Sequence, residues 1–282
     1  MNGVLRAELL STRKRPGVWI VGTAWTTLAV AFGMVVPYVI WLAIKGKPIG
    51  SSGDPEQLIN GLLPDKFLSG TVNLYPMFGS ALMLILGAVL VGGENRWGTW
   101  GTLLVQGPGR AAAVLGKAGA AAVAVLCISV LVVVTSAGAS ALVSALTGRS
   151  AHWPDPTTLL AGVGAIWLVS MAATNLGMLL AILLRGTGAA IGVGLLWLLA
   201  VESLVNGLAG TLPALKGVQR LLIGPSAGSL ATALDPSGTP NTSIPGVVSV
   251  SGPLTASLVL AVYVVVCLGL STLLVSRRDV TA

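Results

Sequence analysis

The feature that most constrains this chain is a series of apolar runs, each about as long as a bilayer is thick. Only 9% of the 282 residues are charged, and 54% are hydrophobic. A helix that crosses the ~30 Å hydrocarbon core needs about 20 apolar residues, whereas a soluble domain carries roughly 25% charged residues. The sequence therefore predicts an all-α membrane protein whose apolar runs are transmembrane helices.

Six runs satisfy this length, and together they predict a single transmembrane domain over residues 1–282. The predicted spans are residues 18–43, 71–92, 111–146, 157–184, 188–207 and 253–276. The third run is too long for one straight crossing, so we expect it to tilt, break or extend past the membrane. Gly188 and Gly192 have the GxxxG spacing that permits close helix approach, although such matches arise easily by chance in a chain with 37 glycines.

Two further segments are expected to lie at or in the membrane without crossing it. Residues 1–16 predict a short amphipathic helix in the interface, an elbow that ends at Pro16. Residues 208–252 form the longest connection, an extracellular loop with an apolar middle from Val218 to Leu234. This middle predicts a re-entrant segment before the last span. The first span follows a basic cluster and is too long for a signal peptide, so it is expected to stay uncleaved.

The distribution of Lys and Arg predicts that both termini are cytoplasmic, because basic residues gather on that side of a membrane. If the N-terminus is inside, the cytoplasmic side holds most of the basic residues: Arg6, Arg13, Lys14, Arg15, Arg96, Arg110, Lys117, Arg185, Arg277 and Arg278. Six spans agree with this orientation, because an even number returns the chain to its starting side.

Several functions are disfavoured by what the sequence lacks. The net charge of +7 comes from basic residues scattered near the ends of apolar runs, which is not the pattern of a nucleic-acid binder. Cys127 and Cys267 lie deep in apolar runs with no metal-ligand spacing, so they are expected to be small buried hydrophobes. No G-x-x-x-x-G-K-[ST] motif occurs, so any ATP that drives this protein must bind a separate chain.

Residues 94–106, between the second and third spans, are the most informative segment. In a helix, Trp97, Trp100 and Leu104 share one face, and Gly107-Pro108-Gly109 ends that helix. An exposed short helix with an apolar stripe suits docking into a groove of a soluble partner, which could pass its motion to the spans. The alternative, which physical reasoning weights about equally, is an aromatic belt at the inner interface.

The same segment resembles the permease subunits of type-2 ABC transporters, of the bacitracin-resistance and lantibiotic-immunity kind. The matching residues of this segment are Glu94, Gly98-Thr99-Trp100, Leu103-Leu104, Pro108, Arg110 and Gly116-Lys117. The stretch Leu5-Arg6-Ala7-Glu8-Leu9 is similar to the elbow helix of that family. Sequence resemblance is concentrated in residues 1–16 and 94–117, and resemblance in topology covers nearly the whole chain.

The resemblance implies a dimer of six-span subunits in a bacterial cytoplasmic membrane, the second subunit being another copy or a paralogue. Two cytoplasmic ABC ATPase subunits would bind ATP and Mg, and this chain would bind no cofactor. The coupling helix would be residues 94–106, with coupling residues Glu94, Arg96, Trp97, Thr99, Trp100, Leu104 and Arg110. The function implied is ATP-driven export, and the few charges in the spans favour a hydrophobic or amphipathic cargo.

Two polar residues within predicted spans are candidates for a substrate path. Glu202 is the one carboxylate expected inside the membrane, which is by default a functional position. It could line a path or pair with Lys216 or Arg220, but a place at the outer, hydrated interface is weighted more heavily. Asn175 could also line the path, although helix–helix hydrogen bonding is the commoner role of such a residue.

A membrane enzyme is the competing function of another class. Gly224-Pro225-Ser226-Ala227-Gly228 matches the G-x-S-x-G pattern of serine hydrolases, and His152, the one histidine, is expected on the same side. A catalytic base should adjoin the nucleophile on a rigid element, whereas His152 lies in a loop near Pro154. A turn between re-entrant segments is therefore the preferred interpretation. A non-catalytic membrane scaffold is a third possibility.

Overall fold

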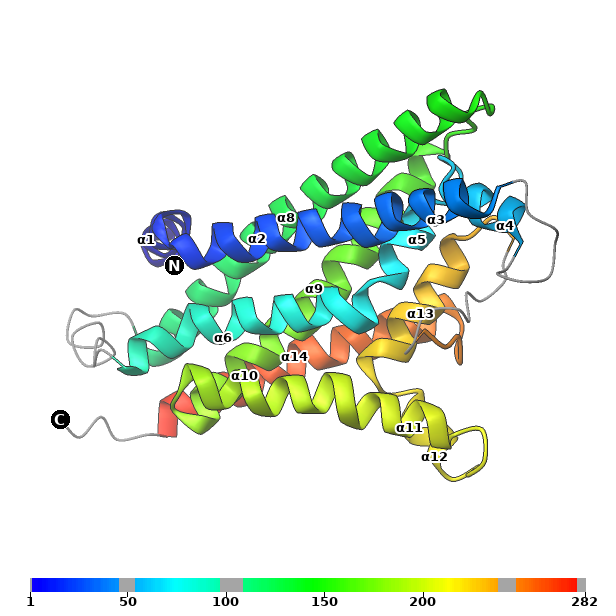
Figure 1. Ribbon diagram of the computed structural model, residues 1–282. Helices are drawn as coiled ribbons and strands as arrows, with labels where there is room; N and C mark the ends of the chain where they lie inside the picture. The colour runs from blue at the N-terminus through cyan, green and yellow to red at the C-terminus, as the bar shows by residue number, and fades with distance from the viewer. Residues whose placement is uncertain (1, 46–53, 97–108, 238–246, 278–282) are drawn as a thin grey trace.

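The computed structural model describes residues 2–45, 54–96, 109–237 and 247–277, and every regular element among them is helical (Figure 1). The α-helices are α1 Asn2–Lys14, α2 Pro16–Val30, α3 Val36–Ile44, α4 Pro55–Asn60, α5 Phe67–Asn73, α6 Ser80–Arg96, α8 Arg110–Thr147, α9 Pro156–Leu184, α10 Thr187–Leu195, α11 Glu202–Leu208, α12 Leu215–Gln219, α13 Ile223–Leu234 and α14 Pro253–Arg277. Three π-helical segments continue these helices: η1 Ala31–Val35, η2 Tyr75–Gly79 and η3 Leu196–Val201.

Six continuous stretches in the described part of the chain are long and apolar enough to cross a membrane. They are Pro16–Ile44, Phe67–Gly93, Ala111–Thr147, Pro156–Leu184, Thr187–Leu208 and Pro253–Arg277. Each overlaps one predicted span, which confirms the all-α architecture with six candidate membrane helices. The second stretch begins earlier than predicted, at Phe67, because the helix continues through the π-helical segment that contains Pro76.

The long third run forms one unbroken helix. α8 has 38 residues, and at 1.5 Å per residue its length is about 57 Å, well beyond the ~30 Å hydrocarbon core. Of the three predicted outcomes, breaking is therefore wrong. In Figure 1 α8 runs obliquely to its neighbours and extends past them at one end.

The centre of the bundle is the contact between α6 and α9, which is the most extensive in the structure. Gly87 of α6 and Gly177 of α9 permit it. A Cβ atom on Gly87 would lie 1.9 Å from the Thr174 carbonyl oxygen, and one on Gly177 would lie 2.1 Å from the Leu84 carbonyl oxygen. The two backbones therefore touch at a crossing that only glycine allows.

The predicted GxxxG contact at Gly188 and Gly192 is not made. Both glycines are exposed, and no heavy atom of the described chain would lie within 4 Å of a Cβ atom at either position, apart from their own helix and chain neighbours. Close helix packing in this fold depends on other glycines. Cys127 also differs from expectation, because it is exposed on α8, whereas Cys267 is buried as predicted.

A buried polar contact joins three of the membrane helices. Trp25 Nε1 donates to the Tyr75 hydroxyl over 3.1 Å, and the Tyr75 hydroxyl lies 3.0 Å from Ser170 Oγ. All three residues are fully buried. The Trp25 and Tyr75 rings also meet edge to face, with centroids 4.9 Å apart. This contact fixes the first span against the second and the fourth.

Between the fifth and sixth spans the described residues form two short helices, α12 and α13. α13 is buried on all sides from Ile223 to Ala231, and it packs against α5, α9 and α14. Figure 1 shows α13 inside the bundle, at the end opposite the two termini. The apolar middle of the long connection therefore forms an inserted helix.

Candidate functional site

Part of the predicted coupling helix lies outside the described residues. Trp97, Thr99, Trp100 and Leu104 fall in this undescribed part. The structure does describe the backbone on either side, where Glu94 and Arg96 lie in the last turn of α6 and Arg110 is the first residue of α8.

These flanking helix ends lie at the same end of the bundle as α1. Figure 1 shows α1 end-on, so it runs crosswise to the long helices, and it packs against α8. We call this region the junction: α1, the α1–α2 corner, residues 89–96, residues 110–119 and the start of α10. Its contacts determine how the segment between α6 and α8 is held.

An ion pair fixes α1 to α8 within the junction. Lys117 Nζ lies 3.1 Å from each carboxylate oxygen of Glu8. Lys117 is 3% exposed and Glu8 is 7% exposed, so both charges are removed from solvent. Burial at this depth makes the pairing important, because the Glu8 carboxylate without Lys117 would be a buried charge without this countercharge.

Two glycines of α8 let α1 approach closely on either side of this ion pair. A Cβ atom on Gly116 would lie 2.8 Å from Val4 Cγ1, and one on Gly119 would lie 2.9 Å from Leu5 Cδ1. The sequence Gly116-Lys117-x-Gly119 is therefore the surface on which α1 packs. Small residues lower the backbone separation, and the lysine supplies the polar contact.

The α1–α2 corner binds the other flanking helix. The Arg15 guanidinium donates to the Leu90 carbonyl of α6. Two residues further, a Cβ atom on Gly17 would lie 3.1 Å from Val89 Cγ1, so α2 and α6 are also close. The N-terminal segment thus contacts both helices that lead into residues 97–108.

The end of α6 is also packed against the start of α10. A Cβ atom on Gly92 would lie 2.3 Å from Thr187 Oγ1 and 3.0 Å from Thr187 Cα. The turn before α10 is tight, because Arg185 adopts a left-handed conformation with φ of 53°. Because of these contacts, a displacement of the α6 end would also displace α1, α8 and α10.

The predicted elbow residues take different positions on α1. Glu8 faces α8 in the buried ion pair, Leu9 is half-buried, and Leu5 and Arg6 are exposed, although the tip of Leu5 reaches Gly119. Sequence reasoning did not select Lys117 as a site residue. The available signal was a lysine within an apolar run, six residues after the run begins at residue 111.

Glu202 lies within the fifth candidate span, where η3 passes into α11, and among the described residues it makes no ion pair with a basic side chain. It is 3% exposed. Its carboxylate accepts from the backbone N–H of Gly224 over 2.8 Å and from that of Ile223 over 3.3 Å. Glu202 therefore caps the first turn of α13, where unpaired N–H groups and the helix dipole favour a negative charge. The expected hydrated position of Glu202 is wrong, because the side chain is buried.

Asn175 is buried within α9 and is 1% exposed. Its amide donates to the Met171 carbonyl over 2.8 Å, and no residue in the described part of the chain is a hydrogen-bond partner of its Oδ1. Asn175 therefore lies in the core of the helical bundle.

The G-x-S-x-G segment is helical. Ser226 is fully buried in α13, and its hydroxyl donates to the Leu222 carbonyl over 2.8 Å. His152 is exposed, and its Nδ1 lies 3.4 Å from Ser150 Oγ. Among the residues that the structure describes, no group of three or more His, Cys, Asp or Glu side chains could hold a metal ion.

Comparison with known proteins places the chain in one family. No curated protein matches it significantly. Residues 58–281 match the model of a family described as a protein of unknown function, DUF2705. The matched region includes the inserted helix α13 and every candidate membrane span except the first. Because this match covers most of its length, the chain belongs to the DUF2705 family.

Proposed function

We propose that this protein is the membrane-spanning permease subunit of an ATP-driven ABC exporter. In this proposal two such subunits, identical or paralogous, enclose the substrate path. Separate cytoplasmic ATPase subunits bind ATP and Mg. Six candidate membrane helices and the Trp-rich segment between the second and third of them support this function.

The junction is the observation that carries the proposal. A segment on which a soluble motor pushes must be joined rigidly to the helices that move. Here α1 is bound to α8 through the buried Glu8–Lys117 pair, and Arg15 of the α1–α2 corner is bound to α6. The helices on both sides of the connection that contains Trp97 and Trp100 are therefore fastened to the N-terminal segment.

This arrangement gives a mechanism for coupling. The ATPase would bind residues 94–106 through Trp97 and Trp100, because tryptophan is among the residue types that most often dominate protein interfaces. Closure of the ATPase dimer would move the ends of α6 and α8. α1 would keep the positions of these two ends fixed relative to each other. The inner mouth of the path would then close while the outer mouth opens.

The proposed orientation in the membrane follows from the basic residues at the junction end of the molecule. The junction would face the cytoplasm of a bacterium, with both termini inside, as the basic residues of this end favour. α1 would lie flat in the inner interface, with exposed Leu10 toward lipid and Arg6 toward headgroups. α13, capped by Glu202, would be re-entrant from the outer side.

The decisive experiment is purification of the tagged protein in mild detergent, followed by mass spectrometry of bound chains. We expect an ABC ATPase to copurify. The double variant Trp97→Ala, Trp100→Ala should lower its recovery by about tenfold, as loss of ~1.4 kcal/mol at an interface would. Trp197→Ala is the matched control, because Trp197 is a 40% exposed tryptophan on η3, away from the junction.

Two outcomes would overturn the proposal. In one, no ATPase copurifies from cells that express the neighbouring genes. In the other, the double variant and Trp197→Ala recover equal amounts of ATPase. The melting temperature of each variant establishes that the membrane domain is folded in every comparison.

A further inference from the structure

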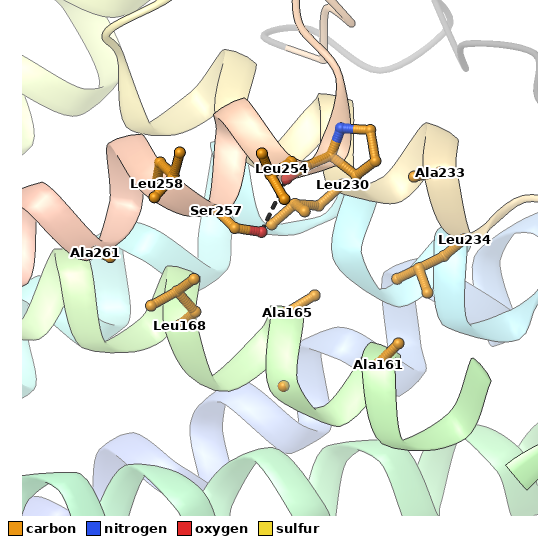
Figure 2. A pocket seen from close by; sticks show the side chains of 12 residues that line it. Ala161, Ala165, Leu168, Leu230, Ala233, Leu234, Leu254, Ser257, Leu258 and Ala261 are labelled. Atoms are coloured by element: carbon orange, nitrogen blue, oxygen red, sulfur yellow. Dashed lines mark hydrogen bonds between the residues drawn. The ribbon is translucent and has the colours of Figure 1, made fainter. Parts of the chain in front are cut away.

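A lateral groove lies between α9, α13 and α14, at the end of the bundle opposite the junction. Its volume is about 820 Å³, within the range of small-molecule and cofactor sites. Figure 2 shows Ala161, Ala165 and Leu168 of α9 on one side of the groove, facing side chains from α13 and α14 on the other.

The groove is deep because its floor carries small residues. Ala161, Gly164 and Ala165 recur on one face of α9 at helical spacing, and a Cβ atom on Gly164 would meet no other atom within 4 Å. Leu254 and Leu258 form the opposite wall and are 76% and 58% exposed. The groove is thus an open apolar slot on the side of the bundle.

The polar content of this groove is already satisfied. Ser257 carries the one side-chain hydroxyl in its lining, and it donates to the Pro253 carbonyl over 2.8 Å. No other lining side chain has a polar atom. A ligand would therefore gain apolar contact in the slot, but it would find no directional polar partner there.

The groove continues into a second, polar pocket. The two share Ala233 and Leu234 at the end of α13, and the second has a volume of about 320 Å³. Asp65, Asp155 and Asp235 line this pocket together with His152. Asp155 is exposed and makes no capping hydrogen bond to α9, although it occupies the N-cap position.

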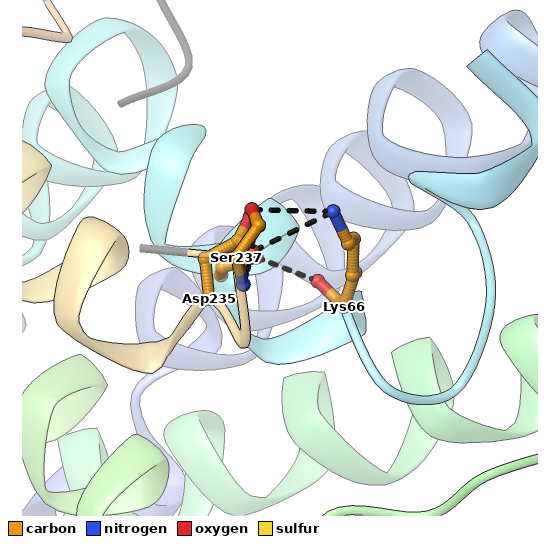
Figure 3. A network of polar contacts seen from close by, with 4 residues as sticks. Lys66, Asp235 and Ser237 are labelled. Atoms are coloured by element: carbon orange, nitrogen blue, oxygen red, sulfur yellow. Dashed lines mark hydrogen bonds and ion pairs between the residues drawn. The ribbon is translucent and has the colours of Figure 1, made fainter. Parts of the chain in front are cut away.

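Lys66 lies beside one of these carboxylates, Asp235. Lys66 Nζ lies 3.5 Å from Asp235 Oδ1 and 3.4 Å from Ser237 Oγ (Figure 3). The rim of the groove therefore carries charges of both signs, with carboxylates in excess. Such a rim is complementary to a headgroup that bears an ammonium beside a phosphate.

We propose that the groove and its acidic rim bind a phospholipid with an ammonium headgroup, which enters sideways from the bilayer. One acyl chain lies along α9 between α13 and α14. The ammonium faces Asp65 and Asp155, and the phosphate faces Lys66. A symmetric dimer in which this groove packs against the same groove of a second copy is disfavoured. Such a two-fold contact would bring two acidic rims close together, and their charges would repel.

The test is native mass spectrometry of the purified protein after exposure to equal amounts of phosphatidylethanolamine and phosphatidylglycerol with the same acyl chains. We expect the protein to retain about ten times more phosphatidylethanolamine, equivalent to ~1.4 kcal/mol of preference. Gly164→Phe should fill the slot and reduce retention by about tenfold. Gly192→Phe is the matched control, since Gly192 is an equally open helical glycine on α10.

A second pair of variants tests the rim. The double variant Asp65→Asn, Asp155→Asn should retain the two lipids in nearly equal amounts. The total amount of lipid bound should stay unchanged. Equal retention of both lipids by the unmodified protein would overturn the proposal. Equal retention by Gly164→Phe and Gly192→Phe would also overturn it. If Gly164→Phe abolishes a dimer without changing lipid retention, the groove belongs to a second copy instead. None of these readouts involves an ATPase, so their failure is distinct from failure of the exporter assignment.

Discussion

Glu8 of α1 and Lys117 of α8 form a buried ion pair, with Lys117 Nζ 3.1 Å from both carboxylate oxygens. The two residues are 109 positions apart in the chain. They join the crosswise N-terminal helix to the helix that follows the predicted coupling segment. Their pairing explains why an apolar helix keeps a lysine at a position that is only 3% exposed.

Removal of one partner should destabilise the protein strongly. Lys117→Met leaves the Glu8 carboxylate buried without a countercharge, which typically costs about 3–5 kcal/mol. We expect a large drop in the melting temperature measured in detergent. The double variant Glu8→Gln, Lys117→Met should recover most of the loss, because no buried charge remains.

The matched control for this prediction is an exposed ion pair at the opposite end. Arg149 donates to Glu56 over 2.7 Å, but the Glu56 side chain is 68% exposed. Glu56→Gln should therefore change stability by about 0–1 kcal/mol. Similar drops for Lys117→Met and Glu56→Gln would mean that the buried pair has no special role in holding α1.

The sequence alone predicts the helices of this fold well, because the length of an apolar run is a local property. The six spans and the inserted segment before the last span are recognised from hydrophobicity. The third run shows the limit of that reasoning. Its length predicts a departure from a simple crossing, but length alone does not distinguish tilting, breaking and extension, and the structure shows one unbroken helix.

The contacts that build the junction depend on tertiary structure, so sequence patterns identify their members without pairing them. Glu8 was selected from the elbow helix, and Gly116-Lys117 from a separate motif. Nothing local indicates that they meet. The glycines illustrate the same limit, since Gly87 and Gly188 look alike in the sequence. Only the α6–α9 crossing distinguishes the essential Gly87 from the open Gly188.

That distinction yields a second prediction, for Gly87→Ala. The added Cβ atom would lie 1.9 Å from the Thr174 carbonyl oxygen, a backbone atom that cannot move without separating α6 from α9. We expect a loss of at least about 1–3 kcal/mol, the usual cost of overpacking, detected as a lower melting temperature. Gly138→Ala is the control, because its Cβ atom meets nothing within 4 Å and should stabilise α8 by ~0.5–1 kcal/mol. A neutral Gly87→Ala would contradict the backbone contact.

The geometry of Ser226 yields a third prediction, which concerns the competing hydrolase function. Ser226 is fully buried, and its hydroxyl is bonded to the Leu222 carbonyl of its own helix. We expect no reaction with a fluorophosphonate probe in membranes, and a change in stability of about 1 kcal/mol or less for Ser226→Ala. Labelling of the natural protein that disappears in Ser226→Ala would instead identify a serine nucleophile.

The fourth prediction concerns the carboxylate that caps α13. Glu202→Leu removes the acceptor of the Ile223 and Gly224 N–H groups and leaves them buried without partners. Loss of such a cap costs about 0.5–2 kcal/mol, and 1–2 kcal/mol corresponds to a factor of roughly 5–30 in a local opening equilibrium. Hydrogen–deuterium exchange over residues 223–231 should therefore accelerate by about that factor. Exchange in α9 should change little.

Glu202→Gln separates the effect of charge from that of hydrogen bonding. The amide oxygen still accepts one N–H, but its interaction with the helix dipole is weaker than that of a carboxylate. We expect the exchange rate over residues 223–231 in Glu202→Gln to lie between those of the natural protein and Glu202→Leu. Glu56→Leu serves as the control, because it removes an exposed carboxylate from α4 at a distance from α13. If Glu202→Leu exchanges like Glu56→Leu over residues 223–231, then packing against α5, α9 and α14 holds the inserted helix without the cap.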